Sequence, residues 1–377
     1  MVGLRRSAEE ETGLSDWGSE AFAEPLQLYL DSIEESAGFH AQGQHILRRS
    51  LLRLLGNRLR MQRDFAKHPE IGEAQIPRPL YVLGLPRTGT TLLHNLLACD
   101  PAARSIRLWE GIFPSPPQPG VPRESDPRIA MAMEWAAAIN QLAPDLARAH
   151  ELNPTGPEEC LWLIEHTFVD FIHELRAHVP AYSAWLEEHE AGQPVYEEYR
   201  RMLQLLAWQH QGQHWVFKAP RHLMGLPGLL KVFPEARIVQ THRDPGEVMP
   251  SLCSLCEIDR KIFAADPDRK AIGDLWMRRL GGGMKTAMGA READLEKERY
   301  VDVHYKELVA DPIGAVRGIY EKHGYPYSDA FEEAMRAWLE ANRQHKHGVH
   351  RYALEDYGLS SDRVNEVFAD YRKRFQL

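Results

Sequence analysis

Hydrophobic and polar positions divide the chain into two helical stretches and a core in which strands alternate with helices. Residues 1 to about 75 carry apolar side chains at helical spacing, as in LLRLLGNRLRMQRDF (51–65). Residues 128 to about 210 are also mostly helical, with breaks near their prolines. The proline-rich stretch 113–127 predicts a loop, because proline lacks the N–H that a helix or strand needs. We expect the two helical stretches to form cap insertions around the core.

Four short apolar runs predict buried strands, and each of them precedes a helical pattern. The runs are LYVLGL (80–85), HWVFK (214–218), ARIVQTH (236–242) and RYVDVHY (299–305). Such alternation predicts an α/β fold in which a parallel sheet is flanked by helices on both faces. We expect a P-loop-like, three-layer core within a single domain that spans residues 1–377.

Two later segments complete this pattern. LGGGMK (280–285) does not follow a strand, and its three glycines predict a bend between helices. The region 340–377 is expected to form a closing loop and then an amphipathic end helix, LSSDRVNEVFADYRKRF (359–375).

Composition and charge narrow the class of protein. The 377 residues include 45 Lys and Arg and 54 Asp and Glu, which gives a formal net charge of −9 and argues against a general nucleic-acid binder. The first residues lack the apolar region of a signal peptide, and no stretch approaches the roughly 20 apolar residues of a membrane span. Four cysteines are too few for a disulfide framework in a chain of this size. We expect a cytoplasmic protein.

The first predicted strand leads into a glycine loop and a helix. GLPRTGTT (84–91) fits the phosphate-loop pattern G-x-x-x-x-G-x-[ST], except that Thr90 stands at the lysine position and the loop's cation is Arg87. Backbone N–H groups and the helix dipole still favour an anion there. The later strands end in lysine, histidine and tyrosine instead of a Walker B aspartate. The loop therefore predicts phosphate binding, and magnesium-dependent nucleotide hydrolysis is disfavoured.

Two more strand ends carry cations. HRDPGEVMPS (242–251) places Arg243 at a strand's carboxyl end and Ser251 on the helix that follows. VFKAPRHL (216–223) places Lys218 at another strand end, with a second arginine and His222 within one turn. Because ligands of open α/β sheets bind outside the carboxyl ends of the strands, both cations should lie on the same side as the glycine loop.

Together these segments resemble the PAPS-dependent sulfotransferases, in the broad bacterial branch of that family. LPRTGTT is similar to the family's 5′-phosphosulfate loop. HRDPGEVMPS is similar to its 3′-phosphate motif, in which a serine follows an arginine after eight residues. The order of elements matches over roughly residues 78–323. The resemblance implies a sulfuryl donor, 3′-phosphoadenosine-5′-phosphosulfate (PAPS), the product 3′,5′-adenosine bisphosphate, a small-molecule acceptor hydroxyl and no metal.

The resemblance also implies roles for individual residues. The 5′-phosphosulfate would be held by Arg87, Thr88, Gly89, Thr90 and Thr91. The 3′-phosphate would be held by Arg243 and Ser251, and the closing segment would add Lys346, Gly348 and Arg351. Lys218 would stabilise the charge that grows on the leaving oxygen in a loose transition state. Leu92 stands where cytosolic relatives have an adenine-stacking tryptophan, so the adenine partner stays unassigned.

Two residues are candidates for the general base that the acceptor hydroxyl needs. His222 is one, because histidine titrates near neutral pH and cytosolic members of the family use a histidine close to their lysine. Glu159 is the other. It lies in NPTGPEECLWLIEHTFVDF (153–171), where a helix is predicted to start near Pro157 and to place Glu159 and His166 on one face.

The same helix start offers a structural role for a neighbouring glutamate. Thr155 and Glu158 have the spacing of a capping box. Two residues are tentative contacts of the acceptor, Glu110 in LWEGIFP and His166.

Two other functions compete with sulfuryl transfer. A P-loop nucleotide kinase or phosphotransferase using ATP is disfavoured by Thr90 and by the missing Walker B acid. A nucleotide-binding regulator with a decayed site is disfavoured by Lys218 and the candidate bases. The sequence does not identify the acceptor or the oligomeric state.

Overall fold

The computed structural model describes residues 1–117, 120–149, 152–342 and 353–377. These residues group into two compact units. The first unit consists of Met1–Ile76, Arg107–Gln211 and Leu255–Asp268, and the second of Pro77–Ile106, Gly212–Ser254 and Arg269–Leu377. Among the described residues, no helix combines the length and the apolar character needed to cross a bilayer.

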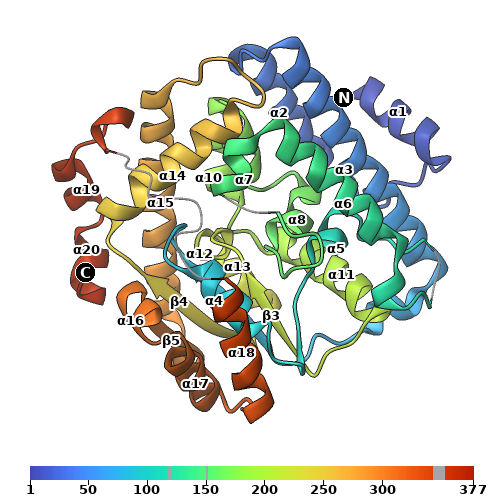
Figure 1. Ribbon diagram of the computed structural model, residues 1–377. Coiled ribbons are helices and arrows are strands. Elements are labelled where there is room, and N and C mark those ends of the chain that lie inside the picture. The colour runs from blue at the N-terminus through green and yellow to red at the C-terminus, as the bar shows by residue number, and fades with distance from the viewer. Residues whose placement is uncertain (118–119, 150–151, 343–352) are drawn as a thin grey trace. The chain divides into compact units, whose positions relative to one another are not determined.

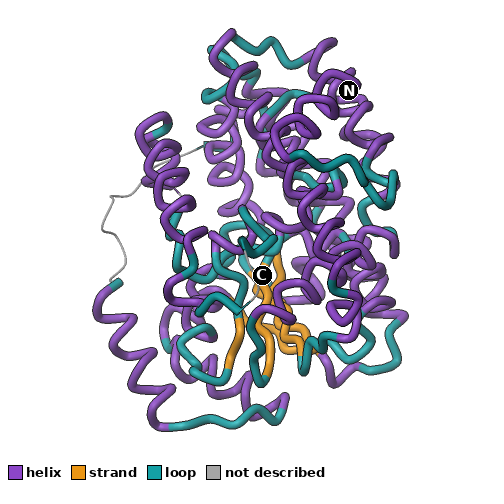
Figure 2. The backbone as a smooth tube through the Cα atoms, turned by 90° about the vertical axis from the view of Figure 1, so that its right-hand side faces the viewer, coloured by secondary structure: helices purple, strands orange, loops and turns teal. Residues whose placement is uncertain are grey.

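The second unit is built on a five-stranded sheet, whose strands are orange in Figure 2. The order of the strands is β2-β3-β1-β4-β5. Its strands are β1 Pro79–Gly84, β2 Ala103–Arg104, β3 His214–Lys218, β4 Arg237–His242 and β5 Tyr300–His304. All four strand pairs are parallel, as the alternating pattern predicts. Only β2 was not predicted, because two residues are too few to show a period.

The helices of the second unit follow the predicted strand-and-helix alternation. They are α4 Thr90–Leu97, α12 Arg221–Met224, α13 Leu226–Val232, α14 Pro245–Arg260 (its last turns belong to the first unit), α15 Arg269–Ala293, η4 Lys297–Arg299, α16 Tyr305–Ala310, α17 Pro312–His323, α18 Asp329–Ala341, η5 Glu355–Tyr357, α19 Ser361–Val367 and α20 Ala369–Phe375. The expected end helix is thus two short helices that meet at Phe368.

These helices cover both faces of the sheet (Figure 1). On one face, Leu80, Val82 and Val239 pack into a core shared with α4, α17 and α18. On the other face, the Tyr81 ring lies beside the Phe217 ring, with centroids 4.9 Å apart, and β1 contacts α12. The predicted three-layer arrangement of helices, parallel sheet and helices is confirmed.

The expected bend at residues 280–285 is wrong, because α15 runs through it without a break. The glycines there serve close packing. A Cβ on Gly281 would lie 2.5 Å from Val367, and one on Gly283 would lie 2.5 Å from Met224. In this helix, contact with neighbouring elements outweighs the weak helical preference of glycine.

The first unit is helical in its regular elements, as predicted for 1–75 and 128–210. Its helices are α1 Val2–Thr12, α2 Ala23–Ser36, α3 Ala41–Lys67, η1 Pro69–Glu73, α5 Leu108–Ile112, η2 Arg123–Ser125, α6 Pro127–Leu142, α7 Pro144–Ala149, α8 Leu161–Ile164, η3 Glu165–Thr167, α9 Ile172–Arg176, α10 Pro180–His189 and α11 Gln193–Gln209. Three of them begin on a proline of the 127–180 region, where the missing N–H needs no intrahelical partner.

Candidate functional site

The loop after β1 owes its shape to two glycines. Gly84 has φ 153° and Gly89 has φ 90°, both in the region that favours glycine. A Cβ on Gly84 would come within 2.4 Å of Thr241 Oγ1 on the neighbouring strand. Gly89 is the N-cap of α4, so the first N–H groups of that helix face the end of the loop. This is the backbone arrangement that binds phosphate.

The three threonines of the loop differ in their surroundings. Thr88 is fully buried, and its hydroxyl donates to the carbonyl of Leu85 at 2.6 Å while lying 2.6 Å from Thr241 Oγ1. Its side chain therefore fixes the loop to β4. Thr90 is buried at the start of α4, whereas Thr91 is exposed beside it. Thr91 is the hydroxyl of the three best placed to donate to a ligand.

Arg87 brings the two predicted phosphate motifs into contact. Its Nε donates to Ser251 Oγ at 3.1 Å, and its backbone carbonyl accepts from the guanidinium of Arg243 at 3.0 Å. Arg243 also donates to Glu247 at 2.8 Å. The predicted proximity of Arg87, Arg243 and Ser251 is thus present in the second unit.

Tyr305 also holds Arg243, and the sequence interpretation missed it. The Arg243 guanidinium lies 4.2 Å from the centroid of the Tyr305 ring, a cation–π contact. The same ring lies against the loop, since a Cβ on Gly89 would be 3.1 Å from it. The available signal was its position, because Tyr305 is the last residue of the last predicted strand.

Lys218 reaches the loop from its other side. Its Nζ lies 3.5 Å from Thr91 Oγ1, and the side chain is 1% exposed. In the sheet register Lys218 is opposite Val82, so it shares the α4 face of the sheet. Because β1 lies between β3 and β4, its loop is flanked by the Lys218 strand end and the Arg243 strand end.

His222 lies in the layer on the other face of the sheet. Its ring packs edge-on against Tyr81, with centroids 5.1 Å apart, and Tyr81 is paired in register with Phe217 rather than with Lys218. The side chain is fully buried. Burial, with the nearby charge of Arg221, lowers the pKa of His222 well below its ordinary value. Near pH 7 it is a neutral and weak base.

In the first unit, the segment that holds Glu159 departs from its predicted helix. Helix α8 begins at Leu161, four residues after the expected start at Pro157, and Phe168 in the left-handed region ends the helical stretch. Glu159 therefore lies before the helix and does not share a helical face with His166. It is half-buried.

The predicted capping box of this segment is also wrong. The Asn153 side chain accepts from the backbone N–H of Thr155 at 3.2 Å and of Gly156 at 3.0 Å, which makes a turn where the helix was expected. Glu158 instead accepts from Trp162 Nε1 at 3.4 Å.

Glu110 has a structural role in its own unit. Its carboxylate accepts the backbone N–H of Arg107 at 2.8 Å and so caps the short helix α5. It also pairs with Arg123 at 3.3 Å and is 1% exposed. These partners already account for Glu110, which weakens its tentative assignment to the acceptor.

His166 belongs to a buried polar network of the first unit. Its Nε2 lies 3.0 Å from Asn57 Nδ2, and its Nδ1 lies 3.0 Å from the carbonyl of Leu163. An N–H on Nδ1 satisfies all of these groups, with Asn57 donating to Nε2. Burial lowers the pKa of His166 to about 4.

The neighbouring carboxylate is charged. Glu165 accepts from Arg53 at 2.6 Å and from Arg176 at 3.0 Å. Burial alone would raise its pKa, but the two guanidinium groups lower the pKa of Glu165 to about 2. Its stabilising charge is therefore lost only as the pH falls below the ordinary value of 4.5, toward 2.

Mild acid should destabilise the protein through His166. Because its pKa is about 4 in the folded chain and 6.5 ordinarily, the unfolded state binds the proton first as the pH falls. The linked loss of stability is about 2 kcal/mol at pH 5 and vanishes above about pH 7. Urea denaturation at pH 8 and at pH 5 measures the difference in unfolding free energy between the two pH values. We expect this difference to be about 2 kcal/mol smaller in His166→Gln than in the wild type.

The control for this measurement is His45→Gln, which removes an imidazole from an exposed position of α3. An unchanged pH difference in the His166 variant would show that the network does not keep this ring neutral.

Three predicted residues, Lys346, Gly348 and Arg351, lie outside the described residues. Their assignment to the 3′-phosphate stays a prediction.

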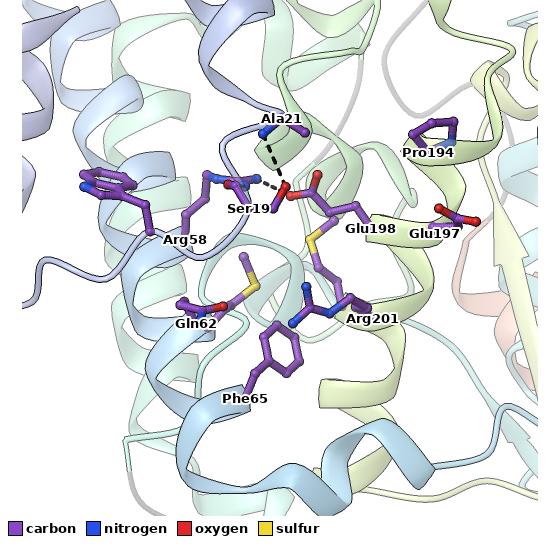
Figure 3. Close-up of a pocket in the computed structure, with 12 residues that line it drawn as sticks. Ser19, Ala21, Arg58, Gln62, Phe65, Pro194, Glu197, Glu198 and Arg201 are labelled. Atoms are coloured by element: carbon purple, nitrogen blue, oxygen red, sulfur yellow. Dashed lines mark hydrogen bonds and ion pairs between the residues drawn. The ribbon is translucent and has the colours of Figure 1, made fainter.

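A cavity of about 240 Å³ in the first unit contains none of the predicted site residues (Figure 3). Arg58 and Arg201 contribute its cationic groups. Arg58 pairs with Glu198, and the Arg201 guanidinium lies 4.5 Å from the centroid of the Phe65 ring. Since no predicted site residue among the described ones lines this cavity, we place the candidate site at the strand ends of the second unit.

A family model and two solved structures that match this chain are those of sulfotransferases. Residues 79–329 match the model of the sulfotransferase family. The crystal structure of sulfotransferase STF1 from Mycobacterium tuberculosis H37Rv is 32% identical, with a TM-score of 0.86 and 98% of each chain covered. Sulfotransferase STF9 from Mycobacterium avium is 30% identical, with a TM-score of 0.90, over 100% of this chain and 96% of that one.

A curated relative is more distant. The omega-hydroxy-beta-dihydromenaquinone-9 sulfotransferase Stf3 of Mycobacterium bovis is 22% identical over 311 residues. The match covers 78% of this chain and 74% of Stf3.

Proposed function

Because the chain belongs to the sulfotransferase family, we propose that it moves a sulfuryl group from PAPS to the hydroxyl of a small-molecule acceptor. The observation that carries this proposal is the contact of Arg87 with both Ser251 and Arg243. This contact places the glycine loop, which suits a 5′-phosphosulfate, next to Arg243 and Ser251. The guanidinium and the hydroxyl of these two residues suit a second phosphate.

The residues of the second unit fit such a donor, which carries anionic groups at both its 5′ and its 3′ position. The Gly84–Gly89 loop and the α4 N-terminus offer backbone N–H groups, and Arg87 adds a guanidinium. Arg243 is half-buried and oriented by Glu247 and Tyr305, which supports its role in recognising the 3′-phosphate. We propose that Thr91 and the backbone of Thr88, Gly89 and Thr90 complete the 5′ end.

Sulfuryl transfer then needs a cation at the leaving oxygen and a base at the acceptor. The acceptor oxygen attacks sulfur as the bond from sulfur to the 5′-phosphate oxygen breaks, and 3′,5′-adenosine bisphosphate leaves. Lys218 is proposed to stabilise the charge that grows on that oxygen. A carboxylate or imidazole takes the acceptor proton.

For the base we favour Glu159 over His222. His222 is fully buried against Tyr81, and its lowered pKa makes it a poor proton acceptor. Glu159 is half-buried and lies before a helix rather than within one. The burial and lowered pKa of His222 therefore favour Glu159, the other candidate from the sequence.

The rival function, an ATP-dependent kinase, has less support. A kinase loop carries a lysine that binds the β- and γ-phosphates, and Thr90 stands at its position here. The lysine that lies near this loop is Lys218, which comes from β3. The names of the relatives favour sulfuryl transfer. Stf3 is named for a hydroxylated menaquinone; for this chain we propose only that the acceptor presents a hydroxyl.

Ligand-dependent stability tests this proposal. We expect 3′,5′-adenosine bisphosphate at 100 times its Kd to add about 2.7 kcal/mol to the unfolding free energy. Adenosine 5′-monophosphate should bind more weakly, because it lacks the group that Arg243 recognises. Arg243→Ala should reduce this preference about 10- to 100-fold, the loss expected for charge-assisted hydrogen bonds. Isothermal titration of both nucleotides measures the ratio.

Arg237→Ala is the matched control, since Arg237 lies at the opposite end of the same strand and pairs with Glu296. Stabilisation by ATP–Mg²⁺ without any by the bisphosphate would overturn the proposal in favour of the kinase.

A further inference from the structure

Helix α20, which contributes none of the predicted ligand contacts, holds the strand end that carries Arg243 (Figure 1). Three of its side chains contact residues 242–244, and all of these contacts lie within the second unit. The sequence separation is large, since Arg372 and Asp244 are 128 positions apart. We propose that Tyr371 and Arg372 are positioning residues for recognition of the donor's 3′-phosphate, an inference that rests on the proposed function.

The first contact runs through His242, which immediately precedes Arg243. Its Nδ1 lies 3.1 Å from Tyr371 Oη, and its Nε2 lies 2.8 Å from Asp302 Oδ1. Asp302 in turn accepts from Arg291 at 2.7 Å and 2.9 Å. A neutral ring with its N–H on Nε2 donates to Asp302 and accepts the Tyr371 hydroxyl proton, so each group has a partner of the right kind.

Packing restrains the same ring. His242 is fully buried and stacks on Phe375, with centroids 4.0 Å apart and planes 21° apart. Tyr371 is 1% exposed and also receives a hydrogen bond from the backbone of Arg243. The backbone at Arg243 is thus held by a side chain of α20 and by the pairing of the preceding residue, His242, with His304 on β5.

The second contact runs through Asp244, which immediately follows Arg243. Asp244 Oδ1 accepts from the Arg372 guanidinium at 2.6 Å and from the backbone N–H of Gly246 at 2.7 Å. The latter bond caps the start of α14, the helix that carries Glu247 and Ser251. Arg372 therefore restrains the turn that begins α14. That helix carries Glu247, whose carboxylate orients Arg243, and Ser251.

The two contacts lie on either side of Arg243 in the sequence, and neither of them involves its guanidinium. If the Tyr371 contact or the Arg372 contact is lost, the Arg243 backbone should shift. The glycine loop after β1 should keep its place, because Thr88 fixes it to β4. The expected signature is a selective loss of affinity for the 3′-phosphate. A general loosening of the fold would weaken all nucleotides alike.

The test compares the Kd of 3′,5′-adenosine bisphosphate with that of adenosine 5′-monophosphate in the full chain. Tyr371→Phe and Arg372→Gln should each reduce the preference for the bisphosphate about three- to tenfold, the effect of one hydrogen bond, with little change for the monophosphate. Lys373→Gln, an exposed neighbour on the same helix, should keep the wild-type ratio.

A double-mutant cycle isolates the ion pair. Asp244→Asn retains an oxygen that can cap α14 but removes the charge that attracts Arg372, so it should lower the ratio as Arg372→Gln does. The double variant should lose no more than either single one. Wild-type ratios in both Tyr371→Phe and Arg372→Gln, with a reduced ratio in Arg243→Ala, would overturn the positioning role and leave the proposed function standing. A wild-type protein without preference for the bisphosphate would overturn the proposed function itself.

Discussion

Replacing Lys218 with methionine should lower kcat about 10²- to 10³-fold, the loss seen when one preorganised donor to a developing negative charge is removed. The lysine is 1% exposed and lies beside Thr91, at the end of the strand next to the glycine loop. A buried ammonium interacts with a growing charge far more strongly than an exposed one does. Single-turnover kinetics with PAPS and a responsive hydroxyl acceptor would measure the step.

Methionine resembles the aliphatic part of lysine but lacks the ammonium group, so Lys218→Met should fold and melt at or above the wild-type temperature. Lys231→Met, at an exposed position of α13, is the matched control. Arg in place of Lys218 keeps the charge but changes its reach, and should recover part of the rate. Wild-type turnover in Lys218→Met would refute the role given to this residue.

Loss of the general base should have an effect of similar size. We expect Glu159→Gln to lower kcat about 10²- to 10⁴-fold, because glutamine keeps the shape of the carboxylate but cannot accept the acceptor's proton. The affinity for 3′,5′-adenosine bisphosphate should stay unchanged.

Glu158→Gln is the control, since the amide oxygen can still accept from Trp162. His222→Asn separates the two candidates for the base. It should retain most of the activity per folded molecule, because this ring packs against Tyr81 on the face of the sheet opposite to Lys218. The reverse result, an inactive His222 variant beside an active Glu159 variant, would make the histidine the base.

The core of the second unit could be predicted from sequence because its signals are local. HWVFK is β3 residue for residue, and the other three predicted strands agree within one residue at each end. Since all the strands are parallel, the position of Lys218 and Arg243 at their carboxyl ends also followed. The contact of Arg87 with Ser251 did not, because it joins residues 164 positions apart.

The errors have local physical causes as well. The predicted helix at Pro157 gave way to a turn because the Asn153 side chain takes the N–H groups that a helix would use. The glycines at 281 and 283 looked like a bend, but their lack of side chains lets Val367 and Met224 approach α15. Periodicity carries no information about either cause, a side-chain hydrogen bond to the backbone in the first case and packing partners far away in sequence in the second.

The order of the strands has a consequence for synthesis of the chain on the ribosome. β1 is buried along its whole length between β3 and β4, yet residues 85–213 must be made before β3 begins. At about 5–20 residues per second, this apolar strand waits roughly 6–26 s without a partner on either edge. An unpaired apolar strand is prone to pair with other chains. Yield in a cell should therefore respond to translation speed and to chaperones that cover nascent strands, even where the finished protein is stable.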